Sequence, residues 1–313
     1  MIKIKEKISY FLSNLFIRNN AHSKYMLGSI FFNQKKKDYH LIKNLDETEY
    51  KVFSQTGEDG ILNYLISILN ISNCKFVEIG VGDYSEANTR YIYENSFSKG
   101  LIIDIEKNFK TKVSKHIHLW KGLLDLENVE VKSKNINEIL NKHNLSDSLD
   151  LFSIDIDGVD YWVINELKNS ISKIFVAEYN PTFGCNLEIT VPNDENFSRF
   201  NAHNSGCYYG ASLKAIVSLM DKKGYDFIGT NKLNFNAFFI VKNLSDKFVK
   251  LKDNLKNMSS YTEIKIRDTR NINGEFNFLD QKERLNLIAD KEIIDVSNQE
   301  HKKYKIKEII SKI

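Results

Sequence analysis

Four oxygen-bearing side chains stand at the ends of two apolar segments in the middle of the chain. Asp155 and Asp157 end the apolar run that begins at Leu149, and Glu178 and Asn180 end the next one. If both runs are neighbouring strands of one parallel sheet, their carboxyl ends share an edge and the four side chains meet there. Carboxylate and amide oxygens are hard ligands that suit Mg²⁺ or Ca²⁺. Crowded carboxylates also repel one another, so a cation or a shared proton is needed. We therefore predict a metal site at these four residues.

Two other interpretations of the same residues stay open. Asp157 and Gly158 could cap the following helix while Asp155 bonds to backbone amides, which needs no metal. Alternatively, Asp155-Ile156-Asp157 is a DxD triplet, by which a metal-dependent glycosyltransferase holds a nucleotide-sugar diphosphate through Mn²⁺ or Mg²⁺. Such triplets are common by chance, and a glycine turn upstream is not expected in that class.

A glycine turn follows the first apolar strand, in the sequence Phe76-Val77-Glu78-Ile79-Gly80-Val81-Gly82. Gly80 and Gly82 would let the backbone turn sharply and lie close to a ligand. Glu78 offers a carboxylate that suits the amino group of a cationic amino acid such as S-adenosylmethionine. The third glycine of a dinucleotide fingerprint is missing, so a pyrophosphate site is disfavoured. The alternative is an ordinary tight turn of an α/β protein.

A second acid supports a nucleoside site. Asp104 ends the apolar run that starts at Leu101, about 25 residues after the first strand, near the spacing that places a carboxylate on a ribose diol. Glu106 is the alternative carboxylate. The order of strand, turn, helix, strand and acid indicates a nucleoside ligand without identifying it.

His203 is a candidate general base. It lies in the long polar segment from Thr182 to Tyr208, which we expect to form a lid inserted after the fifth strand. A histidine in such a loop can accept a proton from an acceptor hydroxyl. The alternative is that it is an ordinary polar surface residue.

These side chains must be positioned by alternating strands and helices. The expected strands are Lys75–Ile79, Leu101–Ile105, His116–Trp120, Leu149–Asp155, Ile174–Tyr179, Asp226–Gly229 and Ala237–Val241. The expected helices between them are Asp59–Leu69, Glu86–Asn95, Asn135–Lys142, Tyr161–Leu167 and Ser212–Lys223. Buried apolar strands separated by helices predict a doubly wound, mostly parallel α/β sheet covered on both faces. We expect this domain to span residues 51–245, with the lid at 182–208.

Two extensions flank this domain. Residues 1–50 are lysine-rich, with apolar residues at helical spacing from Ile4 to Phe16, and predict a basic helical extension. Packing on the main domain is the first interpretation, and weak contact with an anionic membrane surface is the second. Residues 246–313 are charged and predict a helical appendage for packing or for a homo-oligomer.

Composition narrows the function classes. A formal net charge of +3 and the absence of nucleic-acid motifs argue against a nucleic-acid partner. The three cysteines form no CxxC pair and fit a reducing compartment. The apolar run near the N-terminus is too short to span a bilayer, so we expect a cytoplasmic protein.

Taken together, the chain resembles class I S-adenosylmethionine-dependent methyltransferases of the FkbM type. The resemblance is carried in order by Phe53-Ser54-Gln55-Thr56-Gly57-Glu58-Asp59-Gly60-Ile61-Leu62, Val77-Glu78-Ile79-Gly80, Asn88-Thr89-Arg90-Tyr91, Ser153-Ile154-Asp155-Ile156-Asp157-Gly158-Val159-Asp160-Tyr161, Glu178-Tyr179-Asn180-Pro181, Gly210-Ala211-Ser212-Leu213 and Asn236-Ala237-Phe238-Phe239. These segments fall within residues 53–242, and the two extensions lie outside them.

The resemblance implies a Rossmann-like, seven-stranded methyltransferase sheet whose last strand is antiparallel. It implies cofactor contacts from Gln55, Glu78, Gly80, Asn88 and Asp104, with Asp155 at the edge where the methyl group is transferred. Such enzymes methylate hydroxyls of sugars or polyketides. The acids after the fourth and fifth strands also resemble, by position, the Mg²⁺ ligands of catechol-type O-methyltransferases. A non-catalytic scaffold that kept the fold remains the third alternative, beside the methyltransferase and the glycosyltransferase.

Overall fold

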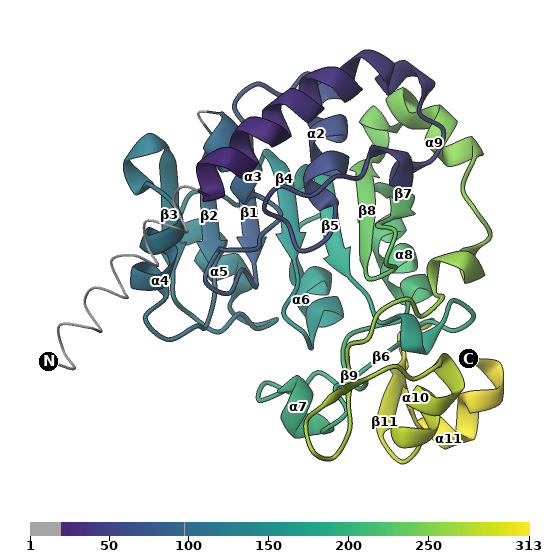
Figure 1. Cartoon of the computed structure of the whole chain (residues 1–313). Helices are drawn as coiled ribbons and strands as arrows, with labels where there is room; N and C mark the ends of the chain where they lie inside the picture. Colours follow the sequence, from purple (N-terminus) through teal and green to yellow (C-terminus); the bar gives the residue numbers. More distant parts are fainter. Residues whose placement is uncertain (1–19, 97) are drawn as a thin grey trace, which may run out of the picture. The chain divides into compact units, whose positions relative to one another are not determined.

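The computed structural model describes residues 20–96 and 98–313 (Figure 1). The apolar residues from Ile4 to Phe16, which suggested an amphipathic helix, lie outside these ranges. Residues 20–35 are helical, and two 3₁₀ helices follow, η1 (Lys36–Leu41) and η2 (Leu45–Thr48). Within the described residues, no helix combines the length and the apolar character needed to cross a membrane.

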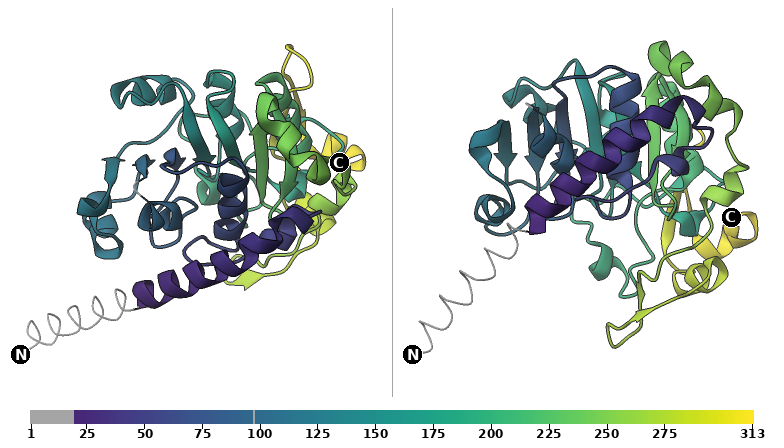
Figure 2. Two further views of the ribbon diagram at one scale, coloured as in Figure 1. Left: turned by 90° about the horizontal axis from the view of Figure 1, so that it is seen from above. Right: turned by 45° about the horizontal axis from the view of Figure 1, so that its top comes forward.

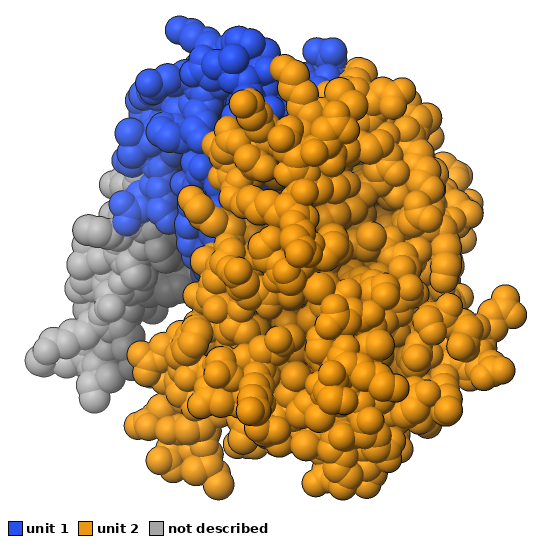
Figure 3. Space-filling model, turned by 90° about the vertical axis from the view of Figure 1, so that its right-hand side faces the viewer, with its two compact units in different colours: residues 1–42, 48–130 blue, residues 43–47, 131–313 orange. Residues whose placement is uncertain are grey.

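The chain divides into two compact units. Unit 1 comprises residues 1–42 and 48–130, and unit 2 comprises residues 43–47 and 131–313 (Figure 3).

Seven strands form one sheet in the order β3-β2-β1-β4-β5-β8-β7. Pairing is parallel from β1 to β2, from β2 to β3 and from β4 to β5. Strand β8, the last of the seven along the chain, runs antiparallel to both β5 and β7. The predicted mostly parallel seven-stranded sheet is therefore confirmed, including the antiparallel last strand.

Unit 1 supplies three of these strands, β1 (Lys75–Ile79), β2 (Lys99–Ile103) and β3 (Leu123–Glu127). Its helices are α2 (Glu58–Ile68), α3 (Arg90–Asn95), α4 (Phe109–His116) and the 3₁₀ helix η3 (Leu119–Lys121). The four residues from Phe76 to Ile79 are all buried, as expected of a strand covered on both faces. Gly100 faces the Phe76 ring in the neighbouring strand so closely that a Cβ atom there would lie 2.3 Å from it.

The strand predicted at His116–Trp120 is wrong. Helix α4 ends at His116, and the third strand begins seven residues later, at Leu123. Side chains take up the backbone acceptors of the intervening segment: the Arg90 guanidinium donates to the carbonyl of His116, and the Tyr93 hydroxyl donates to that of His118. Because these carbonyls are already bonded, the segment does not enter the sheet, although its residues alternate like a strand.

Unit 2 supplies β4 (Leu149–Ile154), β5 (Ser172–Glu178), β7 (Tyr225–Thr230) and β8 (Asn236–Val241). Its helices include α5 (Ile136–Lys142), α6 (Asp160–Glu166) and α8 (Leu213–Lys222). Helix α5 contacts α6, α6 contacts α8, and α8 packs on β7. The segment after β5 holds η4 (Pro181–Phe183), β6 (Ile189–Thr190) and α7 (Arg199–Ala202). This segment contains residues 182–208, which the sequence predicted to be a lid, and the name lid is kept for these residues.

The tail differs from the predicted helical appendage. It begins with η5 (Lys242–Phe248), α9 (Val249–Asp253) and η6 (Met258–Tyr261), and it ends with α10 (Gln281–Leu287), α11 (Ile306–Ile309) and η7 (Ile310–Lys312). Between and beside these lie four strands, β9 (Thr269–Arg270), β10 (Phe276–Asn277), β11 (Glu292–Asp295) and β12 (Lys302–Lys305). The tail is therefore a mixed α/β segment.

Strand β11 explains this difference, because it pairs with the lid. It runs antiparallel to both β12 and β6 in a three-stranded sheet of its own. Buried Phe183, Val191 and Ile189 from the lid share one apolar cluster with buried Leu285, Ile293 and Ile306 from the tail. The lid and the tail thus fold as one body.

Arg284 holds segments of the tail to one another. Its side chain is almost completely buried, donates to the carbonyls of Leu279 and Ile266, and forms an ion pair with Asp268 at 2.7 Å.

We expect Arg284→Met to lower the free energy of unfolding by about 2–4 kcal/mol, because it leaves two partly buried carbonyls without this donor and Asp268 without this partner. Urea unfolding followed by circular dichroism measures this effect, with Lys282→Met, an exposed position on the same helix, as the matched control. Equal midpoints for both variants would contradict the anchoring role.

Candidate functional site

The glycine turn after β1 adopts a conformation that requires its glycines. Gly80 has a φ of 85° and Gly82 a φ of 56°, both in the left-handed region that residues with a Cβ rarely adopt. A Cβ built at Gly82 would meet no atom within 4 Å, so open space lies over this turn. The turn therefore combines close backbone access with room for a ligand.

Asp104, at the carboxyl end of β2, contacts this turn directly. Its Oδ2 accepts a hydrogen bond from the Gly82 amide at 2.6 Å, and its Oδ1 accepts one from the Glu106 amide at 2.7 Å. Burial raises the pKa of Asp104 above its ordinary value, although both hydrogen bonds act in the opposite direction. The side chain is only partly buried, and each carboxylate oxygen can accept a second hydrogen bond. Asp104 thus has acceptor capacity left for a hydroxyl ligand.

Glu78 is more deeply buried, with 4% of its surface exposed. Its Oε1 accepts from the Asn88 amide, and its Oε2 accepts from the amide and the hydroxyl of Thr89. Burial raises the pKa of this carboxyl, against the effect of these bonds. With three bonds to its own chain, Glu78 fixes the turn at Asn88 and Thr89 beside the glycine turn.

Gln55, predicted to contact the cofactor, is exposed on a short loop that leads into α2. The loop is shaped by Asp59, whose Oδ2 accepts the three successive amides of Val52, Phe53 and Ser54, each at 2.7 Å. Burial raises the pKa of Asp59 to about 6. The Phe53 carbonyl then accepts the amide of Ala87, which joins this loop to the segment that Glu78 holds. Unit 1 therefore brings the predicted nucleoside-site residues onto connected loops.

In unit 2, three of the four predicted metal ligands come together. One carboxylate oxygen each of Asp155, Asp157 and Glu178 lies within 4.8 Å of the other two. Glu178 is 6% exposed, and among the described residues its Oε2 has no hydrogen-bond partner. Burial, and then the charge of Asp155, raise the pKa of Glu178 well above its usual range, and burial and Asp157 do the same for Asp155. The crowding that we predicted is therefore present.

Asp160, which the sequence did not single out as a site residue, shapes the turn that carries this acidic cluster. Its two carboxylate oxygens accept the amides of Ile156 and Gly158, at 2.9 and 3.0 Å. Asp157 has a φ of 55°, a conformation that this bonding supports. The backbone bonding that the capping interpretation gave to Asp155 and Asp157 is thus made by Asp160, which leaves those two side chains facing other groups.

Asn180 does not join the cluster as a ligand. It is completely buried, its Nδ2 donates to the carbonyls of Cys207 and Tyr209, and its Oδ1 accepts the amide of Thr182. These bonds fix both ends of the lid to the end of β5. The amide side chain that we predicted as a fourth ligand is therefore engaged in holding the lid.

Arg199, from α7 of the lid, contacts the cluster instead. Its guanidinium pairs with Asp157, lies 3.3 Å from Asp268, and stacks 3.7 Å from the centre of the Tyr209 ring. Burial would lower the pKa of Arg199, but Tyr209, Asp157 and Glu178 raise it above its usual value. One guanidinium facing three carboxylates leaves the cluster acidic, so a divalent cation would still complement it.

His203 directly follows α7 and is partly buried. Its Nδ1 lies 2.7 Å from the Ser205 hydroxyl, and burial and nearby Lys291 lower its pKa. The lowered pKa favours the neutral imidazole, and the Ser205 amide also donates to its Nδ1. The neighbouring Tyr208 and Tyr209 are buried and belong to the packing of the lid.

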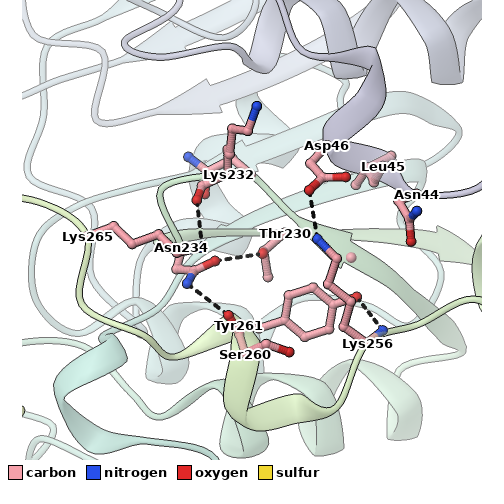
Figure 4. A pocket seen from close by; sticks show the side chains of 12 residues that line it. Asn44, Leu45, Asp46, Thr230, Lys232, Asn234, Lys256, Ser260, Tyr261 and Lys265 are labelled. Atoms are coloured by element: carbon pink, nitrogen blue, oxygen red, sulfur yellow. Dashed lines mark hydrogen bonds and ion pairs between the residues drawn. The ribbon is translucent and has the colours of Figure 1, made fainter.

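A separate hollow lies at the turn between β7 and β8 (Figure 4). Its polar groups bond one another: Lys256 lies 2.7 Å from Asp46, and Asn234 donates to the carbonyls of Ser260 and Glu263. None of the predicted site residues lines it. These polar side chains thus hold the tail against the turn between β7 and β8.

Among solved structures, the chain is similar to several methyltransferases. No family model matches the chain, and no curated protein matches it. An arsenic(III) S-adenosylmethionine methyltransferase from Chlamydomonas reinhardtii aligns at 12% identity over 55% of this chain, with a TM-score of 0.34. An O-methyltransferase family protein from Burkholderia thailandensis aligns at 12% over 58%, with a TM-score of 0.33. Human N-acetylserotonin methyltransferase, in complex with S-adenosylmethionine, aligns at 9% over 70%, with a TM-score of 0.32.

The alignments span 64%, 57% and 55% of those three chains, in the same order. The strand order β3-β2-β1-β4-β5-β8-β7 of this chain defines its fold independently of these values.

Arg199 and a divalent cation should compete for the acidic cluster, because both are attracted by the same carboxylates. We expect Arg199→Ala to bind Mg²⁺ or Mn²⁺ at least tenfold more tightly than the wild-type chain in a calorimetric titration. Arg267→Ala, which removes an exposed guanidinium of the same unit, is the matched control and should bind like wild type. Cation affinity that is unchanged or weaker in Arg199→Ala would remove Arg199 as the competitor.

Proposed function

We propose that this chain is an S-adenosylmethionine-dependent O-methyltransferase, similar to the FkbM branch. The acceptor would be a hydroxyl of a sugar or of a polysaccharide or secondary-metabolite precursor, with Mg²⁺ assisting. S-adenosylmethionine would supply a methyl group activated by the positive charge of its sulfonium.

The contact between Asp104 and Gly82 carries this proposal. A carboxylate at the end of β2 lies against a left-handed glycine turn at the end of β1, and open space adjoins the turn. A ribose diol needs two acceptors at such a place, and Asp104 has unused acceptor capacity. The missing third glycine disfavours a dinucleotide, so a nucleoside without pyrophosphate fits better.

Glu78 is proposed to act as a positioning residue. By holding the amides of Asn88 and Thr89, it fixes the loop that begins α3 beside the turn. Gln55, Gly80 and Asn88 remain proposed contacts of the cofactor, because Gly80 is part of the turn and the Phe53–Ala87 backbone bond joins the loop of Gln55 to the segment of Asn88. The negative charge of Glu78 also favours a cationic amino acid close by.

The acidic cluster is proposed to bind Mg²⁺ through Asp155, Asp157 and Glu178. The buried, unpartnered Oε2 of Glu178 supports this, because a buried carboxylate oxygen without a partner is costly. A cation held there could bind two neighbouring oxygens of the acceptor and make the attacking hydroxyl more acidic. Asp155 stays the proposed residue at the edge of methyl transfer.

Cofactor binding tests the proposal at Asp104. We expect calorimetry to detect S-adenosylmethionine and S-adenosylhomocysteine binding to the wild-type chain, and Asp104→Asn to weaken it about tenfold or more. The substitution replaces one acceptor oxygen by a donor that faces the Gly82 or the Glu106 amide. Glu106→Gln, two residues away and paired with Lys112, is the matched control and should bind like wild type.

Absence of binding in the wild-type chain, with and without Mg²⁺, would overturn the methyltransferase proposal. Binding of uridine diphosphate sugars with Mn²⁺ instead would favour the glycosyltransferase alternative. Binding of neither ligand would favour the scaffold.

His203 is proposed as the general base, because it follows the helix that brings Arg199 to the acidic cluster and its environment favours the neutral imidazole. We expect His203→Ala to lower turnover at least a hundredfold while the affinity for the cofactor stays unchanged. Release of S-adenosylhomocysteine in the presence of a panel of sugar acceptors measures turnover. His301→Ala, an exposed histidine of the same unit, is the control, and equal turnover in both variants would exclude His203 from the chemistry.

A further inference from the structure

The helix at residues 20–35 belongs to unit 1 and packs on the rest of that unit through one side only. Ala21 and Tyr25 contact the buried cluster of Val52, Phe53 and Tyr91, and a Cβ at Gly28 would lie 2.5 Å from Val52. These positions recur at helical spacing and define the inner face of the helix. Close packing at Gly28 fixes which side of this helix, drawn in purple in Figure 2, faces away from the rest of unit 1.

The outward side is apolar, which is unusual for a helix in contact with water. Its large apolar side chains are highly exposed: Met26 by 52%, Leu27 by 67%, Ile30 by 62% and Phe31 by 43%. Spacings of one, three and four residues place them along one stripe of the helix. A contiguous stripe of this kind marks an interaction surface rather than scattered surface residues.

Charge identifies the kind of partner. Residues 1–42 contain eight Lys or Arg against two Asp or Glu, a formal charge of +6, whereas the rest of the chain is negative by three. Within the described part, Lys24, Lys36 and Lys37 are exposed, and Lys35 lies 5.7 Å from the Phe31 ring. Apolar side chains combined with lysines suit a surface that offers both acyl chains and anionic groups.

We propose that the outward face of residues 20–37 docks on the surface of an anionic lipid bilayer. Met26, Leu27 and Ile30 insert at the boundary of the acyl chains, Phe31, whose ring packs edge-on against Tyr50, borders them, and the lysines contact the headgroups. This surface belongs to unit 1 alone and is independent of the proposed methyl transfer.

Co-sedimentation of the full chain with vesicles tests this proposal. We expect binding to vesicles that contain phosphatidylglycerol, much weaker binding to pure phosphatidylcholine, and loss of binding at high salt, which screens the attraction. The double variant Leu27→Ser, Ile30→Ser should bind the anionic vesicles at least tenfold more weakly. Both side chains are exposed, so the variant should fold, which circular dichroism checks.

Two matched controls separate this surface from the rest of the chain. Ile272→Ser with Phe278→Ser removes exposed apolar side chains of unit 2 and should leave binding unchanged. Lys24→Gln with Lys37→Gln should weaken binding by about fivefold for each lysine, whereas Lys302→Gln with Lys303→Gln, also exposed, should not.

Three outcomes would overturn the proposal. The wild-type chain could fail to bind anionic vesicles, or it could bind both kinds of vesicle equally. It could also form a dimer in sedimentation velocity that Leu27→Ser with Ile30→Ser dissociates, which would assign the stripe to a second copy of the chain.

Discussion

Buried and half-buried carboxylates that accept backbone amides hold the loops of this protein in place. Asp59 binds three successive amides ahead of α2, Glu78 binds two ahead of α3, and Asp104 and Asp160 each bind two at the ends of β2 and β4. A desolvated carboxylate is costly unless such bonds compensate it, so each loop is confined to the conformation that provides them. The loops that would receive ligands are therefore pre-formed, and the same interaction recurs in both units.

The sequence alone was sufficient to predict the sheet and the residues that lie at its edge. Runs of buried apolar residues located six of the seven strands within a few residues, and the acids at the ends of β1 and β2 do lie at the glycine turn. Patterns of this kind are local, because a strand buried on both faces must be apolar along its length. The prediction of the third strand failed, because the side chains of Arg90 and Tyr93 bind backbone carbonyls that are distant in the sequence, and no local pattern shows such bonds.

The rest depended on contacts between distant segments. Strand β6 has two residues, and it pairs with β11 about a hundred residues further on, so neither strand carries a recognisable signal. Arg199 was missed for the same reason, because nothing in a polar loop indicates that one arginine will meet Asp157 and Asp268. Asn180 looked like a ligand in sequence, and its burial beneath the lid gave it three bonds to the backbone instead.

Trp162 is placed where its fluorescence can report on the lid. It donates a hydrogen bond to the Val191 carbonyl of the lid, at 2.8 Å, and its ring is partly buried. The chain has only one other tryptophan, Trp120 of unit 1, which is 81% exposed. Ultraviolet emission from this protein therefore contains two spectrally distinct sources, a solvent-relaxed one and a shielded one in contact with the lid. Any movement of the lid away from α6 would be visible in the unlabelled protein as a change in the shielded component.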